Sequence, residues 1–372
     1  MDETIDRLAR LVHAYTAPPG ALKFDNVFVN DQAQVVVTDI APLPAAIPRL
    51  IADALTQLRA ALEHTLFAEV EHRLGRHLSP QEARLIEMPA CASTEDYRAW
   101  LAHRRRSLIP PLQNGAPLTH RIRDLQPFQR RDHADHPMRL LAEHTNVAKH
   151  RTPAVAAARL GPVYPDKPHP GLTTAIPFNP KSQPGDGLPL SVGDVIATGP
   201  GSVRTELSVV VTVSIRRPHT NVWNLVMKEL EYLEDWVRTT AIPLLITGTR
   251  DVAPLPPHMD IAVGHRDLRC ALQLAGPTSA TQRARSRIVS AVARADLIDL
   301  VSNYDRAIPS EAIRNWATAL DDAAITHRLM RLIGLVEQPA ALVEELSTLI
   351  TEVRLFEQQR GSAAGRGSIE DA

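Results

Sequence analysis

The fold of the first half of the chain is decided by the stretch RLIADALTQLRAALEHTLFAEVEHRL, residues 49–74. Its apolar residues recur at steps of three and four, which places them on one face of an α-helix: Ile51, Leu55, Leu58, Leu62 and Leu66. Gly75 follows the pattern directly and is the residue type that commonly ends a helix. The stretch therefore predicts one long amphipathic helix.

The segments on either side of this helix predict further helices and a few strands. Helical patterns cover residues 2–16, 94–106, 137–152 and 221–240, the last with Glu229, Glu231, Glu234 and Asp235 facing outward. Strand patterns cover 27–40, 193–199 and 206–215, and in the last of these apolar residues alternate with Ser and Thr. The predicted fold class is α+β, a helical bundle with a small antiparallel sheet, followed by an all-α C-terminal module.

Proline-rich stretches suggest where the chain divides. Residues 162–189 contain eight prolines and predict an extended loop, and PLPP at 254–257 predicts a boundary. Beyond it, helical patterns cover 279–303, 310–335 and 338–359. We therefore expect a mixed α+β domain over 1–250 with the 162–189 loop inside it. A helical interaction or oligomerisation module is expected over 258–359, with an ordinary helical core as the alternative. A disordered tail is expected over 360–372.

Composition narrows the class of protein. The chain of 372 residues has 44% apolar and 22% charged residues and a net charge of -1, so no overall field attracts nucleic acid or anionic membrane. Two cysteines, Cys91 and Cys270, form no disulfide framework. No signal-peptide pattern and no apolar stretch of about 20 residues occurs. These features predict a cytoplasmic protein without a membrane partner.

A polar stripe on the predicted helix 137–152 is the first candidate site. Arg139, Glu143, Asn146 and His150 are spaced by four, three and four residues and fall within about 60° of one another. An acid, an amide and an imidazole in one line can position and protonate a substrate oxygen, and arginine can hold an anion. The alternative is a solvated helix face with one Arg–Glu pair. His144 falls on the apolar side and is expected to be a satisfied core histidine.

The sequence LRAALEH in the long helix carries the second candidate site, Arg59, Glu63 and His64. Arg59 and Glu63 are one turn apart and can form an ion pair. Arg59 and His64 point about 140° apart on a regular helix. They can meet at one substrate only across a dimer or near a distortion.

These segments resemble a group of uncharacterised bacterial proteins that share an LRxALEH helix and a later NxxKHR motif. The resemblance covers LTQLRAALEHTLF, LQPFQ and HPMRLLAEHTNVAKHR, within about the first 160 residues. More distantly, Arg59-x4-His64 is similar to the Arg-x4–6-His signature of HEPN domains, helical modules that include metal-independent ribonucleases and toxins. That resemblance implies that Arg59 stabilises a phosphate and that His64 acts as general acid or base. Asn146 and His150 would complete the catalytic set, with Glu63, Arg139, Glu143, Lys149 and Arg151 in support.

A basic region that contains the polar stripe of helix 137–152 favours an RNA partner. Residues 98–151 hold eleven Arg or Lys against four Asp or Glu, so this window carries +7 and the rest of the chain -8. Such polarity is typical of a surface that binds phosphates. Only Trp100 and Phe128 could stack on bases there, so sequence-specific recognition is not expected. The alternative is that these charges are dispersed over several helices and cancel locally.

Other motifs give no competing chemistry. Asp132-His133-Ala134-Asp135-His136 is interpreted as a surface turn rather than a metal site, and Arg283 to Arg287 as a solvated helix face. No phosphate-binding loop or dinucleotide-binding motif occurs, so no cofactor and no metal is expected. Two hypotheses remain. The first is a HEPN-like RNA-cleaving protein, such as a toxin or phage-defence effector. The second is a non-catalytic scaffold in which the same polar residues form a structural network.

Overall fold

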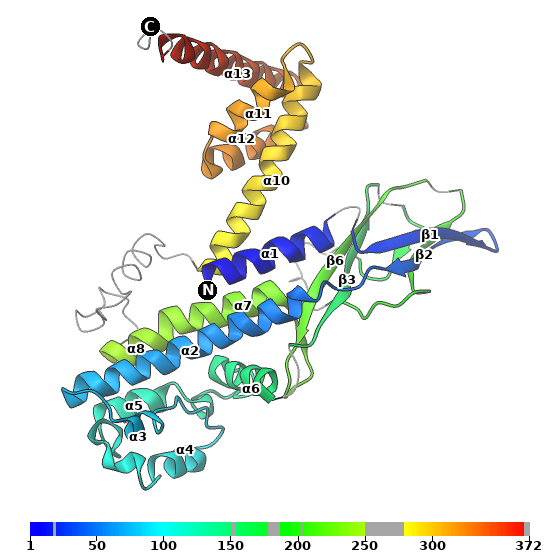
Figure 1. Cartoon of the computed structure of the whole chain (residues 1–372). Helices are drawn as coiled ribbons and strands as arrows, with labels where there is room; N and C mark the ends of the chain where they lie inside the picture. The colour runs from blue at the N-terminus through cyan, green and yellow to red at the C-terminus, as the bar shows by residue number, and fades with distance from the viewer. Residues whose placement is uncertain are drawn as a thin grey trace. The chain divides into compact units, whose positions relative to one another are not determined.

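The computed structural model describes residues 1–17, 20–150, 154–167, 169–177, 187–202, 204–249 and 279–367. By its internal contacts the chain divides into two compact units, Met1–Gln282 and Arg283–Ala372. The first unit combines a helical layer with two small sheets, and the second consists of helices (Figure 1). The α+β class predicted from the sequence is confirmed, including the helical character of the C-terminal region.

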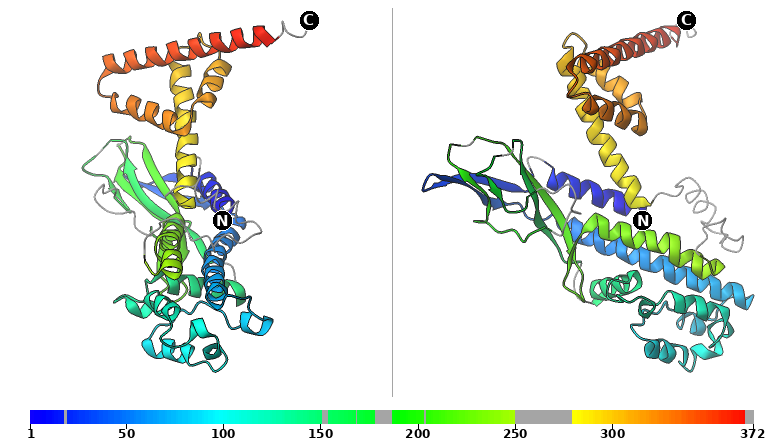
Figure 2. Two further views of the ribbon diagram at one scale, coloured as in Figure 1. Left: turned by 90° about the vertical axis from the view of Figure 1, so that its left-hand side faces the viewer. Right: turned by 180° about the vertical axis from the view of Figure 1, so that it is seen from behind.

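Helix α2, Ala46–Leu74, is the central element of the first unit. It packs against α1 (Asp2–Thr16), α6 (Pro137–His150), α7 (Val226–Trp236) and α8 (Ile242–Thr247). Figure 2 shows α7 and α8 running alongside it. The five apolar residues of the predicted face are at most 1% exposed. Gly75 ends the helix with a left-handed backbone, φ 65°, and donates its N–H to the carbonyls of Glu71 and His72.

Short elements fill the chain between α2 and α6: α3 (Pro80–Ala83), α4 (Thr94–Leu101), η1 (Arg106–Leu108), η2 (Pro110–Leu112), α5 (Pro117–Asp124) and η3 (Pro127–Gln129). The predicted helix 94–106 ends at Leu101. Its start is set by a capping box, in which Ser93 and Asp96 each accept the other's backbone N–H.

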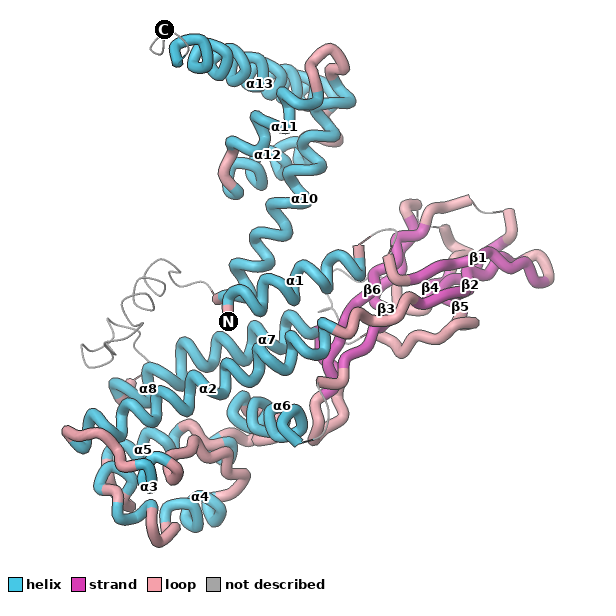
Figure 3. Tube along the Cα trace, viewed as in Figure 1, coloured by secondary structure: helices cyan, strands magenta, loops and turns pink. Residues whose placement is uncertain are grey.

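Two antiparallel sheets lie at one end of the helices of the first unit (Figure 3). The first has the order β1-β2-β5-β4 and the second β3-β6-β7. Their bounds are β1 Leu22–Val29, β2 Gln32–Ile40, β3 Ala156–Pro165, β4 Thr173–Thr174, β5 Val195–Pro200, β6 Leu207–Arg216 and β7 Trp223–Leu225. Asn30 and Asp31 join β1 to β2 with positive φ at both residues, the geometry of a tight two-residue hairpin. Val37, Leu160, Val163 and Ile196 form a small core that draws on both sheets.

The described part of 162–189 differs from the extended loop predicted there. Residues up to Pro165 belong to β3, Thr173–Thr174 form β4, and Leu160 bridges Leu188. Prolines are tolerated because these are edge or short strands, where a missing N–H costs little. Residues 178–186 and the PLPP boundary at 254–257 lie outside the described residues.

Helix 221–240 also differs from its prediction. Residues 223–225 form β7, α7 begins at Val226, and Val237–Ala241 (η4) widen into a π-helix before α8. Glu229 and Glu234, expected to face outward, are buried at 3% and 1% exposure. Their partners are described below.

The second unit contains most of α10 (Ala280–Tyr304), together with α11 (Ser310–Ala319), α12 (Asp322–Gly334) and α13 (Pro339–Gly367). Its core includes Leu297, Ile313, Trp316, Leu332 and Val353. The helix predicted over 310–335 breaks because the Asp321 carboxylate accepts the N–H of Ala324 and starts a new helix. The backbone of 360–367 continues α13, where the sequence predicted the start of a disordered tail. Residues 258–278 and 368–372 lie outside the described residues.

No helix among the described residues is long and apolar enough to cross a membrane.

Candidate functional site

The two sequence motifs line one cleft in the first unit. Its volume is about 880 Å³, and six of the candidate residues line it: Arg59, Glu63 and His64 from α2, and Arg139, Glu143 and Asn146 from α6. The segment 86–92, with Asp96 and Trp100 of α4, forms another part of the lining. Because α2 and α6 pack against each other, motifs about 80 residues apart in the chain share one opening.

Arg59 and Glu63 hold the wall of this cleft. The Arg59 guanidinium lies 2.7 Å from Glu63 Oε1 and donates to the carbonyl of Met88. Glu63 Oε2 accepts the Met88 N–H at 2.6 Å. Arg59 Nη1 also lies 3.1 Å from the Met138 sulfur. Both polar groups of the Met88 backbone are thus held by one ion pair, which fixes the segment 86–92 against α2.

Three candidate residues of the cleft keep polar groups available to a ligand, namely His64, Asn146 and Arg139, and the exposed Thr56 lies in the same lining. His64 and Asn146 are exposed, and neither forms a side-chain hydrogen bond with any other described residue. Arg139 and Glu143 lie 3.8 Å apart, a loose pair on a half-exposed surface. An imidazole, an amide and a weakly paired guanidinium therefore face one solvent-open space.

Cys91 also lines the cleft but offers no nucleophile. Burial, together with nearby Asp96, raises the pKa of its thiol to about 11. The thiol therefore stays protonated near neutral pH, and the thiolate is the reactive form.

The structure does not describe the side chains of three predicted site residues. Lys149 and His150 occupy the last positions of α6, where only the backbone is described. Arg151 lies outside the described residues.

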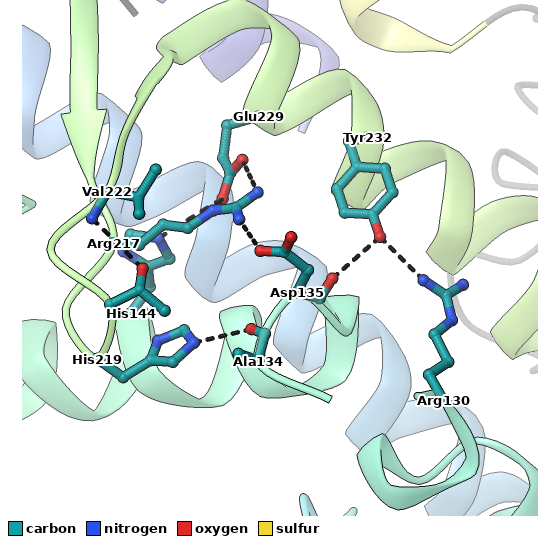
Figure 4. A network of polar contacts seen from close by, with 10 residues as sticks. Arg130, Ala134, Asp135, His144, Arg217, His219, Val222, Glu229 and Tyr232 are labelled. Carbon is teal, nitrogen blue, oxygen red and sulfur yellow. Dashed lines mark hydrogen bonds and ion pairs between the residues drawn. The ribbon is translucent and has the colours of Figure 1, made fainter. Parts of the chain in front are cut away.

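A second polar cluster, which the sequence did not reveal, lies between α6, α7 and the turn from β6 to β7 (Figure 4). The buried Arg217 forms a bidentate pair with Glu229, two bonds of 2.8 Å, and also binds the Asp135 carboxylate. His219 Nε2 bonds the carbonyl of Ala134 at 2.8 Å. Asp135, Arg217 and Glu229 also line a cavity of about 290 Å³. This cluster ties the second sheet to the helices.

His144 lies at the edge of this cluster and is not the satisfied core histidine expected. It is 4% exposed, and its Nε2 has no hydrogen-bond partner among the described residues. Glu229 Oε1 is 4.0 Å away. The pKa of His144 falls to about 4 because of burial, with smaller contributions from Arg217 and His219. Glu229 does not offset the burial, because Arg217 already neutralises its charge.

Residues 132–136 belong to separate contacts rather than to a simple surface turn. Asp135 pairs with Arg217, while the His136 ring stands edge-on to Trp236 with centroids 5.4 Å apart. Burial, with a contribution from Arg130, lowers the pKa of His136 to about 4. Among the described residues, no group of three or more His, Cys, Asp or Glu is arranged to hold a metal ion.

The basic residues of 98–151 divide into inward and outward groups. Arg106 bonds Glu87 and two backbone carbonyls, and Arg121 bonds the carbonyls of Leu245 and Ile246. The exposed members are Arg98, Arg104, Arg105, Arg123, Arg130 and Arg131. Trp100, one of the two aromatics considered for base stacking, already packs on Tyr97 and under Arg106. The window is therefore partly structural, and Trp100 is a poor stacking platform.

No family model, no curated protein and no solved structure matched this chain. Any functional conclusion therefore rests on the geometry of the cleft.

Proposed function

We propose that this protein is a HEPN-like, metal-independent RNA-cleaving protein that acts at the cleft between α2 and α6. The observation that carries the proposal is the shared cleft, where the exposed His64 and Asn146 lie with the half-exposed Arg139, whose only ion pair among the described residues is a loose one with Glu143. The proposed RNA contact is the outward part of the basic region 98–151, and the proposed setting is the cytoplasm, as a toxin or phage-defence effector.

The cleft suggests a division of labour among its residues. In RNA cleavage without a metal, the 2′-oxygen forms a bond to phosphorus as its proton leaves, and the bond to the 5′-oxygen breaks as that oxygen gains a proton. His64 would serve in one of these proton transfers. Arg139 would face the phosphate, and Asn146 would hold a non-bridging oxygen or a sugar hydroxyl.

Arg59 takes a different role in this proposal from the one that the motif implies. Its guanidinium is engaged by Glu63, the Met88 carbonyl and the Met138 sulfur, so little of it is left for a phosphate. It is a positioning residue that fixes segment 86–92. Arg139 is the freer cation in the cleft and takes the phosphate contact.

The test is incubation of the full-length protein with mixed total RNA in EDTA. The wild type should cleave. His64→Ala and the His64→Ala/His150→Ala double variant should lose activity at least about 100-fold, the usual contribution of a positioned acid or base. His13→Ala, an exposed histidine on α1, is the matched control and should retain activity. Full activity in the double variant would remove the proposal.

A non-catalytic scaffold is the second candidate, and the clamp on Met88 favours it. Under this reading Arg59 and Glu63 exist to hold two segments together, as Arg217 and Glu229 do elsewhere. Arg59→Ala would then lower the melting temperature, because it leaves the buried Met88 carbonyl without its partner. No variant would have a catalytic phenotype. Residues 258–359 would bind a protein partner or a second copy of the chain.

A further inference from the structure

One face of α10 carries an unusual combination of exposed side chains. Val289 and Val292 are 48% and 40% exposed, and they are flanked by the exposed Arg285 and Asp296. The four residues are spaced by four, three and four, so they fall within about 60° of one another. This is the spacing of the contact seam in a two-stranded coiled coil. We call these four residues the α10 seam.

The charges of the α10 seam have no partner within the part of the chain that the structure describes. Arg285 and Asp296 form no ion pair there, whereas Arg294, on the same helix, is bound to Asp322 and to two backbone carbonyls. The two unpaired charges have opposite sign and stand at the two ends of the valine pair. Exposed valines and unpaired flanking charges together indicate a surface that is complete only with a partner.

The α10 seam is complementary to itself when a second copy runs antiparallel. A two-fold axis between residues 290 and 291 places Val289 opposite Val292 of the second copy, and Arg285 opposite Asp296. Both relations occur twice, as two-fold symmetry requires. The parallel arrangement would instead place Arg285 beside Arg285 and Asp296 beside Asp296, which like-charge repulsion disfavours.

We propose that two copies of this chain associate through the α10 seam in this antiparallel register. Four valines form the centre of the contact, and two Arg285–Asp296 pairs close its ends. This gives a specific form to the self-association suggested for the C-terminal module, and it does not depend on RNA cleavage. The seam covers about three helical turns, well below the size of a stable interface, so the dimer is a weak, concentration-dependent one.

Sedimentation of the full-length protein at concentrations up to about 1 mM, where a weak dimer would be populated, tests the association itself. The wild type should shift towards a dimer with rising concentration, and Val289→Asp should remain monomeric. Arg314→Glu, an exposed charge reversal on α11, is the matched control and should behave as the wild type. A wild type that stays monomeric throughout overturns the proposal, and so does a Val289→Asp variant that still dimerises.

Charge reversal tests the register. Arg285→Glu alone and Asp296→Arg alone each bring like charges together at both ends, and each should weaken association at least about tenfold. An equimolar mixture of the two variants restores opposite charges at both ends and should associate like the wild type. Two variants that remain monomeric when mixed, or that each associate normally alone, would overturn this register.

The readouts separate this inference from the proposed activity. Both reversals lie in the second unit, whereas the cleft lies in the first. An inactive protein that dimerises as described would therefore leave the α10 seam intact and count against the RNA-cleaving proposal only.

Discussion

Two buried histidines should make the first unit lose stability in mild acid. His136 and His144 are 3% and 4% exposed, and burial lowers the pKa of each from 6.5 to about 4. In the unfolded chain each would titrate near 6.5. Between these values the unfolded state binds more protons than the folded state, so the free energy of unfolding falls as the pH falls.

The size of this effect follows from the two pKa values. At pH 5 an unfolded histidine is almost fully protonated, while the folded one is about one-tenth protonated. The difference is about 2 kcal/mol for each residue and about 4 kcal/mol for both. At pH 7.5 both contributions are close to zero. Most carboxylates stay ionised at pH 5, so the histidines dominate this window.

Urea unfolding at pH 7.5, 6 and 5, followed by tryptophan fluorescence, measures this loss. Three of the four tryptophans, Trp100, Trp223 and Trp236, lie in the first unit. His144→Leu should halve the pH dependence, and His13→Ala, a change at an exposed position, should leave it as in the wild type. An unfolding midpoint that is the same at pH 7.5 and pH 5, with the same slope, would refute the reasoning.

Three substitutions test other parts of the fold. Glu229→Gln should destabilise the first unit by about 2–3 kcal/mol, because the buried Arg217 would lose its bidentate partner and keep only the more exposed Asp135 carboxylate; a loss under about 1 kcal/mol in urea unfolding would contradict this. Gly187→Ala should cost about 2 kcal/mol or more, since φ is 74° and the new methyl carbon would lie 2.6 Å from the Leu160 carbonyl oxygen. An unchanged melting temperature would count against that strand contact. Trp316→Ala should destabilise the second unit by about 3–5 kcal/mol, measured by the loss of helical circular dichroism on unfolding. The unfolding midpoint of the first unit, followed by the fluorescence of its three tryptophans, should stay unchanged, and a coincident shift of both transitions would show one cooperative structure.

Helical periodicity predicted the long helices because the spacing of apolar residues within one segment determines which of its side chains are buried. The apolar stripe of α2 and its glycine stop lie within a single segment, and both are found as expected. In β6 the alternation also holds at Val211, Val213 and Ile215. The exception is Ser214, which is fully buried because its side of the strand is also covered.

The same periodicity was wrong where a distant segment covers the edge of an apolar face. Val226 lies near the centre of the apolar face of α7. Glu229 and Glu234 lie about 60–80° from it, at the edges of that face, whereas Asp235 lies on the opposite side and is exposed. Glu229 is buried because it binds Arg217, and Glu234 because it accepts N–H groups from Ala280 and Thr281. Neither partner is close enough in sequence for a local pattern to reveal it.

The candidate site shows the same division between local pattern and tertiary contact. Spacing alone put Arg139, Glu143 and Asn146 on one stripe, and these residues do line the cleft.

The geometric objection to the other motif was that Arg59 and His64 point about 140° apart. The structure agrees with this objection: Arg59 turns to the Met88 backbone, while His64 stays exposed at the opening. A catalytic pair made of Arg59 and His64 is therefore the weaker arrangement. The pair to test is His64 of α2 with Arg139 of α6, because in the part of the chain that the structure describes the Arg139 guanidinium is held only by a loose ion pair with Glu143. If the cleft cleaves RNA, Arg139→Ala should lower kcat and leave the melting temperature nearly unchanged. Arg59→Ala should lower the melting temperature and have the smaller effect on kcat.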